Sequence, residues 1–158
     1  MIFKTILVPY DGSAMSDKAL DKAVELANII KESRIIIMHV VPEIPTPIFS
    51  RVIRSPKTGE VITFSEYMVS LYQEIESEMR EKLEKRKEKY SKYGFSIEIY
   101  ITTGIPTDKV IQYATDKKVD IIVIGSIGVT GISKFFKGLG SVSRNVSEKV
   151  SCPVLIIR

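Results

Sequence analysis

Short runs of apolar, β-branched residues alternate along the chain with longer segments whose apolar residues recur every three or four positions. Such runs are typical of strands buried on both faces of a parallel sheet, and such segments are typical of amphipathic helices. The pattern predicts strands over 2–8, 34–41, 95–102, 119–124 and 153–157. It predicts helices beginning near Ser13, Ser65, Pro106 and Ser141. Strict alternation of strands and helices favours a three-layer α/β sandwich around a five-stranded parallel sheet.

Two of the predicted strands have the character of sheet edges. Residues 95–102 alternate apolar and polar side chains, as a half-exposed strand does. The apolar run from Val154 to Ile157 is the last of the chain, and an uncovered hydrophobic edge invites pairing with another strand. We therefore expect a homodimer joined through the C-terminal strand.

A long helix is predicted from Ser65 to about Lys92, with Gly94 as the residue that closes it. Its predicted apolar side comprises Met68, Leu71, Ile75, Met79 and Leu83. The opposite side carries many Glu and Lys residues, and the pairs Glu78–Lys82 and Glu81–Lys85 have the spacing that supports an exposed helix. This charged side is expected to be a solvated surface.

The segment from Pro42 to about residue 64 interrupts the alternation. Four prolines exclude any regular element longer than a turn or a hairpin, and two apolar pairs, at 52–53 and 61–62, predict a small ribbon. Long loops in compact domains are often functional. A lid over a ligand, a dimer contact and a tolerated insertion all stay open, although Ile44, Ile48 and Phe49 count against simple disorder.

Composition narrows the class of protein. A length of 158 residues with 44% hydrophobic residues suits one domain over 1–158. The net charge of +4 is mild and its charges are mixed in sign, so no nucleic-acid partner is expected. The single cysteine agrees with a reducing compartment. No signal sequence and no membrane-spanning run is recognisable, so we expect a cytoplasmic protein without a membrane partner.

Glycines cluster after the predicted strand at 119–124. Five of the nine glycines fall between Gly125 and Gly140, and Ser141 and Ser143 follow as candidate N-caps of a helix. Glycine permits positive φ and lets a ligand approach bare N–H groups, and a helix N-terminus favours anions. The cluster predicts a phosphate cradle, with simple strand-to-helix turns as the alternative.

An acidic residue should face this cradle. Ligands of open parallel sheets bind at the carboxyl ends of the strands, where the turns after residues 8, 40 and 124 converge. Asp11 lies in the first of these turns. A carboxylate beside a phosphate site usually holds a ribose hydroxyl or a divalent cation.

Several motifs together resemble the universal stress protein family along essentially the whole chain. They are Ile-Leu-Val-Pro-Tyr-Asp-Gly-Ser near the start, His39-Val40-Val41, Gly104-Ile-Pro, Gly-Ser-Ile-Gly-Val-Thr-Gly leading to Gly-Ser-Val-Ser, and Cys-Pro-Val-Leu-Ile-Ile-Arg. The resemblance implies an adenine nucleotide hydrolase-like fold, with sheet order 3-2-1-4-5 and usually a homodimer.

Nucleotide-binding members have a signature of Gly, two residues, Gly, nine residues, and Gly followed by Ser or Thr. Here Gly125, Gly128 and Gly138 have this spacing, but Leu139 follows Gly138 and the Gly-Ser pair comes two residues later. We interpret this as a two-residue insertion, with Gly140 and Ser141 as the functional pair. A degraded phosphate end is the alternative.

The resemblance implies a site for ATP, with AMP or ADP as alternatives. Asp11 would take the adenosine end, Val40 would flank adenine, and the glycine-rich residues would face the phosphates. As the carboxylate beside the cradle, Asp11 is also the candidate ligand of a Mg²⁺ ion. Ile127 stands where the family often has His. The predicted binding residues are Pro9, Tyr10, Asp11, Val40, Gly125, Ser126, Ile127, Gly128, Gly140, Ser141, Val142 and Ser143.

Catalysis has little support in the sequence. With one His and one Cys, no nucleophile with a base can be assembled; His39 fits a core histidine and Cys152 a structural residue. A Walker-type lysine is lacking, which leaves Lys134 or Lys137 as weak substitutes.

The leading hypothesis is a regulatory protein that binds ATP, with at most slow hydrolysis. A dimeric interaction module without nucleotide is the competing hypothesis, and a metabolite-binding relative is a third.

Overall fold

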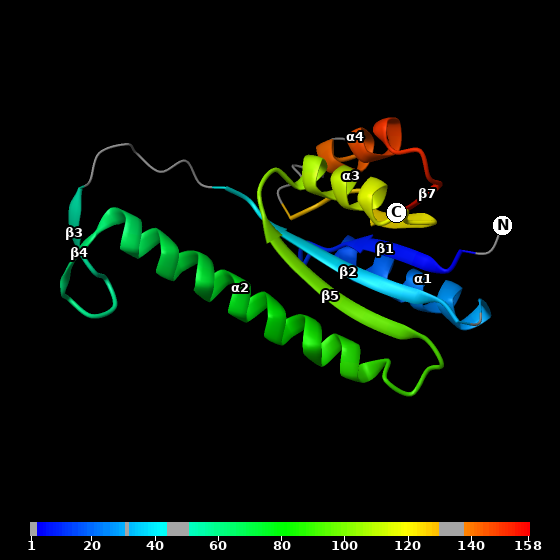
Figure 1. The fold of residues 1–158 in the computed structure, drawn as a ribbon, viewed down its shortest axis with the longest axis horizontal. Helices are drawn as coiled ribbons and strands as arrows, with labels where there is room; N and C mark the ends of the chain where they lie inside the picture. Colours follow the sequence, from blue (N-terminus) through cyan, green and yellow to red (C-terminus); the bar gives the residue numbers. More distant parts are fainter. Residues whose placement is uncertain (1–2, 31, 44–50, 130–137) are drawn as a thin grey trace.

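A five-stranded parallel sheet forms the centre of the molecule. The computed structural model describes residues 3–30, 32–43, 51–129 and 138–158. The sheet strands are β1 (Thr5–Pro9), β2 (Arg34–Val41), β5 (Ser96–Thr103), β6 (Ile121–Gly125) and β7 (Val154–Ile157). Their order is β5-β2-β1-β6-β7, which confirms the order 3-2-1-4-5 once the strands of a separate hairpin are set aside (Figure 1).

Helices cover both faces of this sheet, which gives the three predicted layers (Figure 1). One face carries α1 (Ala14–Ile29) and α2 (Phe64–Lys89), and the other carries α3 (Pro106–Asp116) and α4 (Ser141–Lys149). Because side chains alternate along a strand, Ile6 and Val8 enter the core under α1, whereas Leu7 enters the core under α3 and α4.

Both predicted edge strands lie at the edges. β5 pairs only with β2 within the five-stranded sheet, and its residues alternate between buried Ile97 and exposed Ser96 and Glu98. β7 closes the opposite edge against β6. Leu155 at the centre of β7 is 42% exposed, so this edge presents apolar surface.

The predicted ribbon is present as an antiparallel hairpin of β3 (Val52–Arg54) and β4 (Val61–Thr63). Its turn contains Gly59, whose φ of +74° is favourable for glycine. The hairpin lies beside the N-terminal end of α2, away from the central sheet (Figure 1). Ile44, Ile48 and Phe49 lie outside the described residues.

The long helix differs from its prediction at both ends. It begins at Phe64, because Thr63 and Glu66 form a reciprocal capping box, and it ends at Lys89 with Tyr90 as C-cap. Gly94 is therefore not the closing residue. Of the predicted apolar side, Met68 and Leu83 are buried, and Leu71, Ile75 and Met79 are half-buried. The N-terminal half of α2 extends beyond the sheet (Figure 1).

The charge pairs of α2 also follow the prediction only in part. Lys85 Nζ lies 2.6 Å from Glu81 Oε1, as expected. Lys82 does not pair with Glu78, and instead donates to the backbone carbonyl of Gly12 at 3.4 Å. The predicted solvated surface thus contains a contact with the loop after β1.

Within the described ranges, no helix is both long enough and apolar enough to cross a membrane.

Candidate functional site

A cavity of about 580 Å³ opens at the carboxyl ends of β1, β2 and β6. Every predicted site residue except Ser126 lines it. Residues that the sequence analysis did not include also line it, namely Ser13, Ser16, Met38, His39, Pro42, Pro106, Val110, Ile124, Val129, Gly138 and Leu139. The structure therefore brings together the three turns that were expected to converge.

The turn after β1 is built around the start of α1. Ser13 is the N-cap of this helix, and its hydroxyl accepts a hydrogen bond from the Ser16 N–H at 3.1 Å. The Asp11 carboxylate accepts from the Ser13 N–H at 3.0 Å, which turns the chain into the helix. The N-cap therefore lies at Ser13, where the sequence predicted the start of the helix.

Asp11 joins this turn to the glycine-rich loop. Its Oδ2 atom accepts a hydrogen bond from the Val129 N–H at 2.8 Å. The turn after β1 and the loop after β6 therefore meet at this carboxylate. Burial would raise the pKa of Asp11, but hydrogen bonds from Ser13, Val129 and Ser16 outweigh it and lower the pKa. Asp11 is therefore ionised at neutral pH and directly contacts the glycine-rich loop that it was expected to face.

Gly128 is required by its closeness to Asp11. A Cβ atom at this position would lie 2.5 Å from Asp11 Oδ2, a distance that forces one of the two groups to move. Gly128 thus permits the contact between the carboxylate and the glycine-rich loop. Its φ is not in the left-handed region, so close approach rather than backbone strain explains the glycine.

Gly125 has a different structural reason. A Cβ atom here would lie 2.8 Å from the backbone carbon and the Cβ of Met15 in α1. The end of β6 consequently packs directly on the first turn of α1. Gly125 lines the cavity, yet its missing side chain is explained by contact between a helix and a strand.

The entrance to α4 also lines the cavity. Its N-cap is Gly140, and no side chain caps the helix, which corrects the expectation that Ser141 or Ser143 would do so. The Gly140 N–H is already bonded to the Ser126 carbonyl at 2.7 Å. The first-turn residues Ser141, Val142 and Ser143 line the cavity, so the positive end of the helix dipole faces it.

Ser126 supports this helix entrance from below the cavity surface. It is buried, and its carbonyl also accepts a hydrogen bond from the Ser143 hydroxyl at 2.9 Å. A single backbone oxygen thereby holds both the N-cap and the first turn of α4. Ser126 itself is therefore a support of the α4 entrance and is not part of the cavity lining.

The remaining wall is apolar. Met38 and Val40 at the end of β2, Ile127 and the α3 residue Val110 contribute it. His39 also lines the cavity, but it is buried, and its Nδ1 lies 2.8 Å from the Tyr10 carbonyl oxygen. The interpretation of His39 as a core histidine is confirmed. The α3 residues were missed because their apolar spacing indicates only a core-facing helix.

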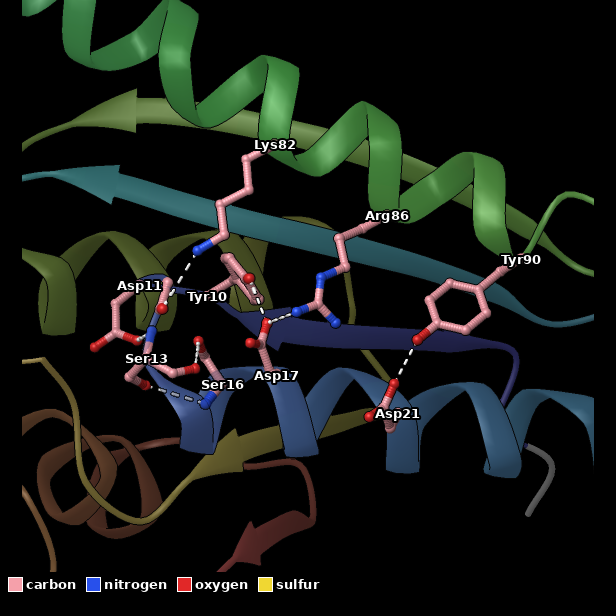
Figure 2. A network of polar contacts seen from close by, with 10 residues as sticks. Tyr10, Asp11, Ser13, Ser16, Asp17, Asp21, Lys82, Arg86 and Tyr90 are labelled. Atoms are coloured by element: carbon pink, nitrogen blue, oxygen red, sulfur yellow. Dashed lines mark hydrogen bonds and ion pairs between the residues drawn. The ribbon is translucent and has the colours of Figure 1, made fainter.

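A polar network behind the cavity connects the β1 turn with α1 and α2 (Figure 2). Tyr10 donates its hydroxyl to Asp17 Oδ1 at 2.5 Å, and Arg86 Nη2 of α2 lies 2.7 Å from the same oxygen. Burial, followed by the bond to Asp17, raises the pKa of Tyr10. Similarly, Tyr90 donates to Asp21, and burial and this bond raise the pKa of Tyr90 to about 12. Both tyrosines therefore remain neutral donors.

Other predicted groups do not enter this geometry. Lys134 and Lys137 lie outside the described residues. Cys152 packs against the core under α3 and α4, and burial raises the pKa of its thiol. Among the residues whose placement is described, no three His, Cys, Asp or Glu side chains gather where they could hold a metal ion.

Comparison with known proteins agrees with this architecture. The family model described as universal stress protein family matches residues 2–158. Universal stress protein YxiE of Bacillus subtilis is 37% identical over 99% of this chain and all of its own length. Universal stress protein MJ0577 of Methanocaldococcus jannaschii is 31% identical over the whole of this chain and 96% of its own.

Solved structures share the fold. The structure of MJ0577 matches with a TM-score of 0.78 at 29% identity, covering 99% of this chain and 96% of that one. A universal stress protein in complex with cAMP matches with a TM-score of 0.64 at 23% identity, covering 100% and 98%. A family member from Arabidopsis thaliana with AMP bound matches with a TM-score of 0.62 at 19% identity, covering 98% and 90%. The match along the full chain and the identity to YxiE and MJ0577 establish that this protein belongs to the universal stress protein family.

Proposed function

We propose that this protein binds ATP, or another adenine nucleotide, in the cavity at the carboxyl ends of β1, β2 and β6, and that occupancy serves as a regulatory signal in a stress response. One arrangement carries the proposal: an ionised Asp11 and the N-terminus of α4, which no side chain caps, line the same cavity. These two groups suit the two parts of a nucleotide, because carboxylates bind ribose hydroxyls and helix N-termini bind phosphates.

The size and lining of the cavity support the same ligand class. Its volume of about 580 Å³ lies within the range of small-molecule sites. Met38, Val40 and Val110 offer an apolar surface on which adenine would stack. The relatives solved with cAMP and with AMP carry ligands of this class.

In place of a ribose hydroxyl, the Asp11 carboxylate would hold Mg²⁺. A magnesium ion beside ATP usually takes one or two carboxylates and completes its shell with phosphate oxygens and water. Among the described residues that line the cavity, Asp11 is the acidic side chain that fits that requirement. The ion would neutralise phosphate charge, and the α4 amides would orient the phosphates.

The proposal is tested in two steps. Freshly purified protein is denatured and the released small molecules are identified, and the emptied protein is then titrated with ATP with and without Mg²⁺ by calorimetry. We expect an adenine nucleotide in the first step and saturable binding in the second. Asp11→Asn should weaken binding about tenfold, the loss expected for one charged hydrogen bond. Asp116→Asn, at an exposed position at the end of α3, is the control and should bind as the wild type does.

A nucleotide-free interaction module is the second candidate, and one observation favours it. The Asp11 carboxylate already accepts hydrogen bonds from two backbone N–H groups, those of Ser13 and Val129. In this candidate Asp11 would serve only to join the two loops. Absence of both released nucleotide and measurable ATP binding would rule out the first candidate.

A further inference from the structure

The loop that carries Asp11 is contacted by Lys82 of α2, which lies 70 residues after Gly12 in the sequence. Lys82 Nζ donates to the Gly12 carbonyl at 3.4 Å and lies 5.7 Å from the centre of the Tyr10 ring. A Cβ atom on Gly12 would lie 3.3 Å from the same nitrogen. The lysine therefore contacts the residue before Asp11 and the residue after it (Figure 2).

The backbone at Gly12 has a conformation that glycine adopts without strain. Its φ of +84° lies in the left-handed region, where glycine has wide freedom and loses much conformational entropy when fixed. Asp11 directly precedes it and must aim its carboxylate at the Val129 N–H. A donor that fixes the Gly12 carbonyl therefore also restricts where the Asp11 carboxylate points.

Lys82 is itself anchored. The next residue, Leu83, is fully buried against the sheet, and one helical turn further on Arg86 pairs with Asp17, which holds the Tyr10 hydroxyl. The neighbouring lysine, Lys85, faces Glu81 instead. Thus the two cations of α2 at 82 and 86, four residues apart on one side of the helix, both act on the β1 turn.

We propose that Lys82 is a positioning residue of the nucleotide site: by holding Gly12 it orients the Asp11 carboxylate toward the ribose hydroxyls. The inference rests on the proposed function for its ligand, but the contact between α2 and the loop does not depend on any ligand. It also makes α2 the element through which a change outside the cavity would alter nucleotide affinity.

The first test needs no nucleotide. Amide hydrogen exchange is followed by NMR at Ser13 and Val129, whose N–H groups donate to Asp11, in the wild type, Lys82→Met and Lys85→Met. We expect exchange about fivefold faster in Lys82→Met, the change for one lost hydrogen bond, and unchanged exchange in Lys85→Met. Lys82→Arg, which keeps a donor, should restore protection. Equal protection in both methionine variants would overturn the proposal.

The second test separates positioning from charge. Affinities for ATP and for 2′,3′-dideoxy-ATP, which lacks both ribose hydroxyls, are compared in the same variants. Positioning through Asp11 predicts that Lys82→Met weakens ATP about fivefold and leaves the dideoxy compound unchanged. Equal weakening of both would mean that Lys82 acts only by its charge and would refute the proposal. If the wild type binds neither compound, the proposed function fails, and the exchange experiment still decides whether Lys82 holds the loop.

Discussion

Two glycines of the cluster lack side chains for unrelated reasons. Gly128 makes room for the Asp11 carboxylate, whereas Gly125 makes room for the backbone of Met15. The sequence predicted that both belong to one loop. Their spacing predicted one common role, the binding of an anion. The role of Gly125 depends on a helix more than a hundred residues earlier, so no local pattern could have indicated it.

Replacing Gly125 should therefore damage the fold itself. We expect Gly125→Ala to lower the free energy of unfolding by about 1–3 kcal/mol, since the new methyl group would overpack the contact with α1. Gly94→Ala is the matched control, because a Cβ there meets nothing within 4 Å. Urea unfolding of both variants checks this, and equal midpoints would show that α1 shifts without cost.

The lowered pKa of Asp11 predicts that the stability of the protein depends on pH. Its pKa in the folded protein lies below 3.8, so folding favours the charged form; the resulting stabilisation is present above about pH 4 and is lost as pH falls through the folded-state pKa. The difference in unfolding free energy between wild type and Asp11→Asn should therefore shrink on acidification. Urea unfolding from about pH 7 to pH 3 measures it. A difference independent of pH would mean that the Asp11 charge does not contribute.

At the scale of elements, the helix entrances differ in how they are completed. α1 and α2 begin with side-chain caps from Ser13 and Thr63, whereas α4 begins at Gly140 without one. The sequence predicted the start of α4 correctly, but Ser141 and Ser143 appeared as equally good caps. Their positions inside the first turn leave its entrance open toward the cavity.

The capping box of α2 should stabilise its projecting half locally. Thr63→Ala removes the acceptor of the Glu66 N–H and should cost about 1 kcal/mol at the start of the helix. The loss should appear as faster amide exchange in the first turns of α2, with little change in the urea midpoint, because this half contributes few buried residues. Ser65→Ala, exposed in the same turn, is the control. Uniformly faster exchange throughout the sheet would contradict a local effect.

Only some of the features of α2 were predictable from the sequence. Its existence, its length to within a few residues and the Glu81–Lys85 pair were predictable from local spacing. The contact of Lys82 with Gly12 was not predictable, because the spacing of Lys82 from Glu78 predicted an ion pair within the helix instead. Only the packing of Leu83 on the sheet brings Lys82 to Gly12.

For the whole molecule, we expect self-association through β7. The strand lies at an open edge and exposes Leu155, so pairing with a second copy would cover apolar surface and satisfy free backbone groups. Sedimentation velocity should show a dimer for the wild type and a monomer for Leu155→Lys. Val69→Lys, at an exposed apolar position of α2, should remain dimeric. The reverse result would place the interface on α2.

The architecture was the most predictable level. Alternating apolar runs predicted every strand of the sheet and both its edges, and resemblance to the family supplied the strand order. The convergence of three turns at one cavity followed from the parallel topology. The wall contributed by α3 did not follow, because a pocket needs distances between elements that periodicity does not contain.

The β3–β4 hairpin has a practical consequence. Its turn at Gly59 is open to solvent, and the hairpin stands at the far end of α2 from the sheet (Figure 1). An epitope inserted there, or a fluorophore on an engineered thiol, would leave the cavity at the end of the central sheet undisturbed. Paired with a second dye near Asp116, it would report by energy transfer any swing of the helix in living cells.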